Sequence, residues 1–138
     1  MVRGYILNNL MTSMNKYAAL VLSSIIFMAA HLMNANLSIL GVINLFLAGL
    51  VLGIYYIHKR NLWFSIGMHL TWNFFQGPVF GFEVSGYETH SIIGQNIQGS
   101  EIITGGEFGF EGSILATILI TGIIIYLHFK YRNNEAVS

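Results

Sequence analysis

The chain of 138 residues is 54% hydrophobic and only 9% charged, with a mean hydropathy of +0.63 and no net charge. Soluble domains carry about 25% charged residues, so this composition indicates an integral membrane protein. The six Lys and Arg residues form no basic stripe, which argues against nucleic-acid binding. The absence of cysteine excludes disulfides, a thiolate nucleophile and a zinc–thiolate site.

Four apolar stretches predict membrane-spanning helices, of which the first is long enough for a locally thin bilayer and the third is short for a span. They cover residues 17–33, 37–57, 62–75 and 113–129. The fold class that we expect is therefore all-α, a polytopic transmembrane helix bundle with about four spans. A chain of this length accommodates a single membrane domain, over residues 1–138, whose spans share one interior.

The first stretch, 17–33, imitates a secretory signal peptide, because a basic start and an apolar run precede Ala29 and Ala30. The leader up to Lys16 is long for such a peptide, and further spans follow. We therefore expect a retained helix.

Turn and capping residues set the limits of the later stretches. Asn61 and Ser113 are expected N-caps of the third and fourth helices, and Pro78 ends the third. The segment 77–112 is rich in Gly, Ser, Asn, Gln and Glu, which predicts a Gly-rich extramembrane loop.

Basic and acidic residues fall on opposite sides of the membrane when the chain is followed through these four spans. The basic side holds Arg3, Lys16, Lys59, Arg60, Lys130 and Arg132. The opposite side holds Glu83, Glu88, Glu101, Glu107 and Glu111. Because basic loops stay in the cytoplasm, we expect both termini to be cytoplasmic.

Two polar pairs interrupt otherwise apolar helices. Phe27 and His31 are four residues apart, as are His69 and Asn73, so each pair shares one helix face. Polar groups at membrane depth usually face the protein interior and serve a function. We therefore expect His31, His69 and Asn73 to meet in one pocket between helices.

Two imidazoles and a carboxamide suit metal binding, positioning of water or stabilisation of an oxyanion. A carboxylate base is missing, because the chain has no Asp and no Glu lies in a predicted span. Glu107 and Glu111 could fold back as replacement carboxylates, but we expect both in solvent on the opposite side, with Glu111 favoured by the positive end of the fourth helix.

Structural roles also fit these residues. His31 alone is equally compatible with a buried structural histidine. His69 and Asn73 could form an interhelical hydrogen bond worth about 0.6 to 2 kcal/mol. Arg3 alone would be a cytoplasmic anchor, and Phe27 a packing residue. Gly49 and Gly53 predict close helix packing; none of these readings needs catalysis.

The sequence resembles the carboxy-terminal part of the CPBP intramembrane proteases, which include CAAX prenyl proteases and the bacteriocin-processing or immunity proteins also called Abi proteins. Their motifs FxxxH and HxxxN match Phe27 to His31 and His69 to Asn73. Supporting similarity lies at 49–53, 61–63 and 105–113. Arg3 is similar to the end of the family motif EExxxR, whose glutamate pair we would expect before Met1, so the chain is expected to be truncated and to lack the catalytic glutamates.

The resemblance implies hydrolysis of a peptide bond in a membrane-associated peptide or protein, either prenylated or bacteriocin-like, in a bacterial plasma membrane. It implies catalytic roles for His31, His69 and Asn73, and zinc or another divalent metal on His31 and His69. Since Asn is a poor zinc ligand, Asn73 is expected to donate a hydrogen bond. Membrane lipid is the other expected partner, and the sequence does not distinguish monomer from dimer.

Two other functions remain open at this point. A catalytically inactive membrane scaffold or bacteriocin-immunity-type protein of the same fold would explain the missing base. A b-type haem protein would use His31 and His69 as axial ligands. Loss of the phenotype on histidine substitution, and a missing haem absorption band, would separate these functions from a protease.

Overall fold

The computed structural model describes residues 2–135, with side chains described to Arg132, and confirms the all-α class. In chain order the elements are η1 (Val2–Ile6), α1 (Leu7–Ser13), α2 (Lys16–Ala29), α3 (Ile39–Lys59), α4 (Leu62–Phe74), η2 (Phe75–Val79), α5 (Glu101–Thr104), η3 (Gly106–Phe108), η4 (Phe110–Gly112) and α6 (Ile114–Glu135). In place of strands, the described residues hold an isolated bridge between Val84 and Tyr87.

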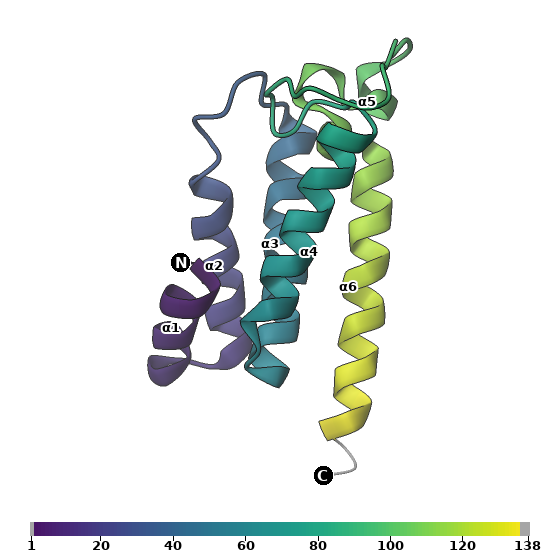
Figure 1. The fold of residues 1–138 in the computed structure, drawn as a ribbon. Helices are drawn as coiled ribbons and strands as arrows, with labels where there is room; N and C mark the ends of the chain where they lie inside the picture. The colour runs from purple at the N-terminus through teal and green to yellow at the C-terminus, as the bar shows by residue number, and fades with distance from the viewer. Residues whose placement is uncertain (1, 136–138) are drawn as a thin grey trace.

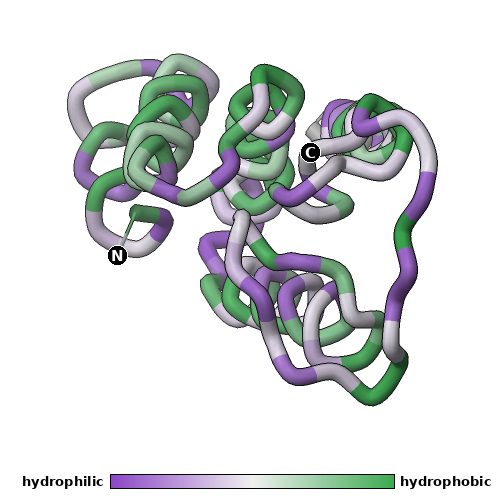
Figure 2. The backbone as a smooth tube through the Cα atoms, turned by 90° about the horizontal axis from the view of Figure 1, so that it is seen from above, coloured by the Kyte–Doolittle hydropathy of each residue, from purple (hydrophilic) through white to green (hydrophobic). Residues whose placement is uncertain are grey.

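Helix α3 is the centre of the bundle. Figures 1 and 2 show α2, α3 and α6 side by side in a row, with α4 packed in front of α3. Successive long helices run in opposite directions, so the chain passes up and down the bundle. The segment between η2 and α6 lies across one end and covers it (Figure 1).

The ends of α3 and α4 follow from their capping residues. Ser38 accepts a hydrogen bond from the backbone N–H of Gly41 at the start of α3. Arg60 ends α3 in the left-handed conformation, at φ 53°, and Asn61 then accepts from the N–H of Trp63 to start α4. The predicted N-caps at Asn61 and Ser113 are confirmed, since Ser113 accepts from the N–H of Ala116.

The first predicted stretch is shorter in the structure than 17–33. Helix α2 ends at Ala29, and His31 lies in the turn that follows. Its 14 residues extend for about 21 Å, against about 30 Å of hydrocarbon. The helix has therefore already ended before the polar residues Asn34 and Asn36.

Residues 2–13 are helical, which the sequence analysis did not predict. Polar and apolar residues alternate irregularly in this segment, so its apolar contact face is not evident from the sequence. Leu7 on this face is fully buried and belongs to the main core with Leu20 and Ile54. Asn8 accepts hydrogen bonds from Tyr56 and Arg60, at 3.3 and 2.9 Å, which tie α1 to the end of α3.

The segment 77–112 differs in part from the solvated loop that we expected. Residues 88–100 are exposed, but Phe108 and Glu111 are buried against the bundle. At Gly109, where φ is 92°, a Cβ would overlap the Glu83 carbonyl oxygen, so this position requires glycine. We call the segment from Phe80 to Gly112 the cap.

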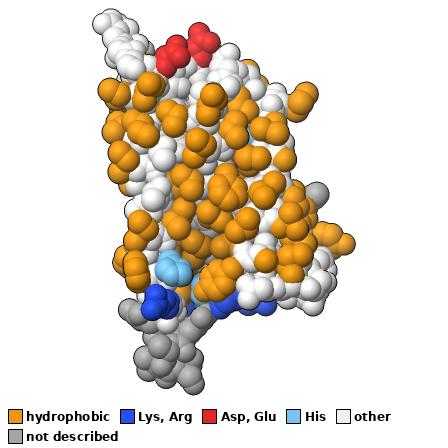
Figure 3. Space-filling view, turned by 180° about the vertical axis from the view of Figure 1, so that it is seen from behind, with side chains coloured by type: hydrophobic (Ala, Val, Ile, Leu, Met, Phe, Trp, Pro, Cys, Tyr) orange, Lys and Arg blue, Asp and Glu red, His pale blue; other side chains and the backbone are white. Residues whose placement is uncertain are grey.

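Two helices, Ile39–Lys59 and Ile114–Arg132, are long and apolar enough to cross a membrane. Large apolar side chains are also exposed along the shorter helices, among them Ile25 on α2 and Leu70 on α4. Figure 3 shows such side chains in a broad belt, with acidic groups at one end of the molecule and basic groups at the other. This distribution fits a membrane-embedded bundle.

Candidate functional site

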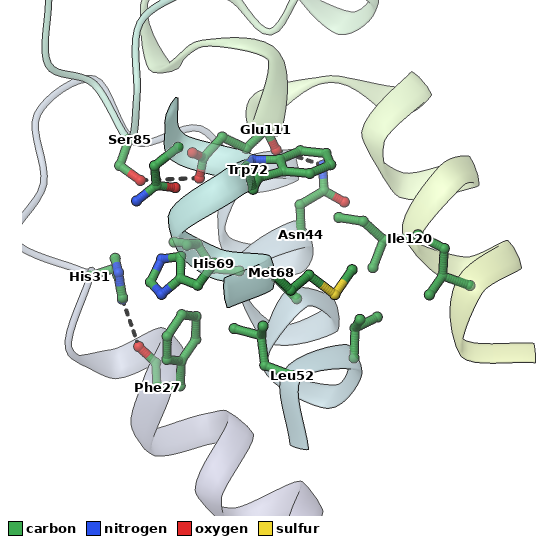
Figure 4. A pocket seen from close by; sticks show the side chains of 15 residues that line it. Phe27, His31, Asn44, Leu52, Met68, His69, Trp72, Ser85, Glu111 and Ile120 are labelled. Atoms are coloured by element: carbon green, nitrogen blue, oxygen red, sulfur yellow. Dashed lines mark hydrogen bonds between the residues drawn. The ribbon is translucent and has the colours of Figure 1, made fainter. Parts of the chain in front are cut away.

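A cavity of about 70 Å³ lies between the helices beneath the cap (Figure 4). Such a volume holds a few water molecules. Most of its apolar lining residues lie on α3 and α6. Its polar lining residues are His31, Asn44, His69, Asn73, Ser85 and Glu111. The structure thus brings the three sequence-predicted site residues, His31, His69 and Asn73, to one cavity.

Phe27 lies against both histidines. Its ring centroid is 4.6 Å from that of His31 and 5.7 Å from that of His69. This contact agrees with the packing role expected for Phe27, which is buried and belongs to the smaller core cluster. The aromatic ring therefore packs against two imidazoles, one from the turn after α2 and one from α4.

The tautomer of His31 follows from its backbone contact. Nδ1 lies 2.8 Å from the carbonyl oxygen of Phe27, four residues earlier in the chain. A carbonyl oxygen only accepts, so Nδ1 carries the hydrogen and Nε2 of the neutral ring is left as an acceptor. The turn after α2 thus preserves the i, i+4 relationship of the FxxxH motif, although the helix itself has ended.

Arg3 corrects the expectation of a cytoplasmic anchor, because its side chain is only 7% exposed. Nη1 donates to Ser23 at 2.7 Å, and the guanidinium lies 5.3 Å from the Phe27 ring centroid. The Nε and Nη2 donors of Arg3 have no hydrogen-bond partner among the described residues. Arg3 thus supports the residue that contacts both histidines.

Two glycines of α3 make room for this arrangement. A Cβ at Gly49 would lie 2.9 Å from the Ser24 Cβ and 3.1 Å from Arg3 Nη2. A Cβ at Gly53 would overlap the side chain of Leu20 and approach Arg3. The prediction of close helix packing at this pair is confirmed, and the space also holds the guanidinium.

Glu111 overturns the prediction that its side chain lies in solvent. It is 8% exposed, lines the cavity, and lies with Ser85 on the opposite side of the histidines from Phe27 (Figure 4). Its carboxylate accepts from Gln76 Nε2 at 3.2 Å and from Ser85 Oγ at 3.0 Å. Burial raises the pKa of Glu111, against the opposing effects of these two hydrogen bonds and of His31.

Asn44, which is 1% exposed, holds the Glu111 segment against α3. Its side-chain amide donates to the carbonyl oxygens of Glu111 and Ser113, at 2.7 and 2.9 Å. Its Oδ1 accepts from the hydroxyl of Thr117 at 2.7 Å. One side chain therefore satisfies groups at the start of α6 and positions the buried carboxylate.

Sequence reasoning missed Asn44, and it considered Glu111 as a replacement carboxylate but placed it in solvent. A signal for Asn44 was present, because it is the one polar side chain between Ser38 and Tyr55. Glu111 had no comparable local signal, since it lies in a polar, Gly-rich segment. Its burial depends on contacts with Asn44 and Gln76, 67 and 35 residues earlier in the chain.

The described residues do not fit a catalytic zinc site. Such sites use three protein ligands from His, Asp, Glu or Cys. No three side chains of these types lie close enough to hold a metal ion in the part of the chain that the structure describes. His31 and His69 would supply two donors, and Asn73 is a weak third.

An apolar groove of about 860 Å³ adjoins the cavity on the side of α4 that faces α6. Met68 and Trp72 line both spaces, and Leu119 closes the groove from α6. The rest of its wall is largely aromatic: Trp63, Phe64, Phe75, Phe80, Phe82 and Phe110. An apolar chain can therefore approach the polar cavity from this side.

The family model described as Type II CAAX prenyl endopeptidase Rce1-like matches residues 1–75 of the chain. This range contains Arg3, His31, His69 and Asn73, and it ends before Glu111. Comparison with curated proteins and with solved structures gives no match.

Proposed function

Since the chain belongs to the Rce1-like family of type II CAAX prenyl endopeptidases, we propose that it hydrolyses a peptide bond of a prenylated peptide at the cavity between α2, α3 and α4. The observation that carries this proposal is the convergence of His31, His69 and Asn73 on one cavity. His31 lies in the turn after α2 and the other two lie on α4, and each has a polar group that a hydrolytic reaction can use.

The roles follow from the hydrogen-bonding capacity of each side chain. His31 accepts through Nε2 because Nδ1 is bound to the Phe27 carbonyl, so it can hold a water molecule by one hydrogen. His69 and Asn73 lie one helical turn apart and donate toward the carbonyl oxygen of the substrate. Their N–H groups would stabilise the negative charge that develops there when water attacks.

The apolar groove suits the hydrophobic part of such a substrate. A prenylated cysteine carries a long hydrocarbon chain at the position before the C-terminal residues. Placing that chain between α4 and α6 buries apolar surface on both partners. Met68 and Trp72 connect the groove to the cavity, so the lipid would guide the adjacent peptide bond toward His69.

We further propose that α2, α3, the helical run of α4 with η2, and α6 each cross the bilayer. The exposed apolar belt and the separated charges support four crossings (Figure 3). The short helices would require a locally thin bilayer, or a tilt of the longer ones. In this arrangement the basic end faces the cytoplasm, in a bacterial plasma membrane.

The test uses the purified full chain in lipid nanodiscs with a prenylated CAAX-type peptide and the same peptide without its prenyl group. We expect cleavage of the prenylated peptide, detected by mass spectrometry, and its loss in His69→Ala. His90→Ala is the control, because His90 is exposed in the cap. Equal cleavage by His69→Ala and wild type would contradict the role given to His69, and no cleavage by the wild type would favour a non-catalytic scaffold.

A further inference from the structure

Glu111 is the acidic side chain that lines the cavity. The other described glutamates of the cap, including Glu88 and Glu107, lie outside it. No hydrogen bond or close contact pairs the Glu111 carboxylate with Lys or Arg in the described part of the chain, so its charge is offset by the Ser85 and Gln76 donors and by nearby His31. Burying an ionisable group in such a place costs stability. Such groups are concentrated at functional sites.

The carboxylate is held from several directions. Ser85 and Gln76 each donate to a different oxygen of Glu111. The side-chain amide of Asn44 donates to the main-chain carbonyl oxygen of Glu111 and so holds its backbone in place. A carboxylate oxygen accepts more than one hydrogen bond, so each oxygen can still accept from a water molecule in the cavity.

We propose that Glu111 is the general base of this site and takes a proton from the attacking water. The water would have one hydrogen on His31 Nε2 and the other on the Glu111 carboxylate. Its oxygen lone pair is then available to attack the carbonyl carbon, whose oxygen is received by His69 and Asn73. The inference rests on the proposed function and adds the group that the two sequence motifs do not provide.

The reaction balances within these groups. The water oxygen forms a bond to the carbonyl carbon, the carbonyl electron pair moves to its oxygen, and one water proton passes to Glu111. When the tetrahedral species collapses, the carbon–nitrogen bond breaks and the leaving nitrogen takes the proton back from Glu111. One water and one peptide bond thus become a carboxyl group and an amine, and the carboxylate is regenerated.

The raised pKa of Glu111 suits this role, because a base with a pKa close to the working pH both accepts and returns a proton readily. A purely structural role is the alternative, in which Glu111 only connects the cap to η2 through Ser85 and Gln76. The two roles predict different results when the Glu111 carboxylate is replaced by the amide of glutamine. The glutamine oxygen can accept the hydrogen bond from Gln76 and the glutamine NH2 can donate to the Ser85 hydroxyl oxygen, but glutamine has no basic carboxylate.

The decisive variant is therefore Glu111→Gln, assayed in nanodiscs with the prenylated peptide beside Ser85→Ala, Glu107→Gln and His69→Ala. General-base catalysis contributes about 10² to 10⁴ in rate. We expect Glu111→Gln to lower kcat at least about 100-fold, with KM and the thermal unfolding midpoint close to wild type. Ser85→Ala removes one hydrogen bond to the carboxylate but keeps the base, so its kcat should fall far less. The kcat of Glu107→Gln should resemble that of wild type.

Activity of Glu111→Gln within about threefold of wild type would overturn the inference, as would an equal loss in Ser85→Ala. Activity that is lost in His69→Ala but kept in Glu111→Gln would leave the proposed function standing. A wild-type protein without peptidase activity would contradict both. If Glu111→Gln fails to fold, Glu111→Asp replaces it, with a carboxylate withdrawn by one methylene, and wild-type turnover by a folded Glu111→Asp would count against the inference.

Discussion

The side chain of Asn44 and the main chain of Glu111 are joined by a 2.7 Å hydrogen bond across 67 residues of sequence. The same amide reaches Ser113 at 2.9 Å, so α3 holds both the cap and the start of α6. The two sequence motifs that contain His31, His69 and Asn73 lie on α2, the turn after it, and α4. Asn44 thus links the part of the chain that the family model matches to the part that it does not.

Replacing Asn44 with alanine should destabilise the bundle. The substitution leaves two buried carbonyl oxygens and the Thr117 hydroxyl without this partner, at a cost of about 1–3 kcal/mol for a buried unsatisfied group. Thr117→Val is the matched control, because it removes one of the three hydrogen bonds and keeps the shape. Unfolding of both variants in detergent micelles, followed by circular dichroism, measures the difference; equal stability of the two would contradict the role given to Asn44.

The oxyanion role predicts a specific kinetic pattern for Asn73. Removal of one oxyanion donor costs about 10² to 10³ in kcat, so Asn73→Ala should lose that much turnover and change KM little. Because His69 and Asn73 act on the same oxygen, the double variant should be little worse than the poorer single variant. Steady-state kinetics with the prenylated peptide test this, and losses that simply multiply would separate the two residues.

Local pattern predicted the helices with strong apolar runs and predicted them well. Helices α3 and α4 lie within two residues of the expected stretches at both ends. Spacing also placed His69 and Asn73 on one face, and the pairing of His31 with Phe27 survives because a turn keeps the same i, i+4 contact. These features depend on residues that are close in the sequence, so the sequence pattern is sufficient to predict them.

The features that the sequence pattern did not predict depend on contacts between residues far apart in the sequence. Composition indicates that Glu111 is solvated, and only its contacts with Asn44, Gln76 and Ser85 bury it. Arg3 likewise carries a charge that predicts exposure, yet two glycines of α3 create the space that receives it. Pairing over such separations is a property of the folded bundle.

Close packing between α2 and α3 should make Gly49 intolerant of a larger residue. A methyl group there would lie 2.9 Å from the Ser24 Cβ and 3.1 Å from its Cα, and it would press on Arg3. Such overpacking costs about 1–3 kcal/mol. In contrast, Gly122→Ala on α6 meets nothing within 4 Å and should gain about 0.5–1 kcal/mol of helix stability. Thermal unfolding of both variants checks the sign, and a stabilising Gly49→Ala would refute this packing.

The donor set predicts how the activity responds to chelators. His31 and His69 are two donors where a catalytic zinc needs three, so we expect turnover to survive dialysis against a strong chelator. Peptidase assays before and after dialysis, with metal content measured by mass spectrometry, provide the test. Loss of activity that added Zn²⁺ restores would establish a metal enzyme and contradict the water-binding role of His31.

The membrane topology predicts three different labelling results from single cysteines, which are easily introduced because the chain has none. Glu88→Cys in the cap should react with a membrane-impermeant maleimide in intact cells, and Lys59→Cys at the basic end only after permeabilisation. Leu70 is 68% exposed in the isolated bundle, but we place it against lipid, so Leu70→Cys should react only after denaturation in detergent. Ready labelling of Leu70→Cys in native membranes would mean that α4 faces water, and the apolar groove beside it would then not be a lipid-facing entrance to the cavity.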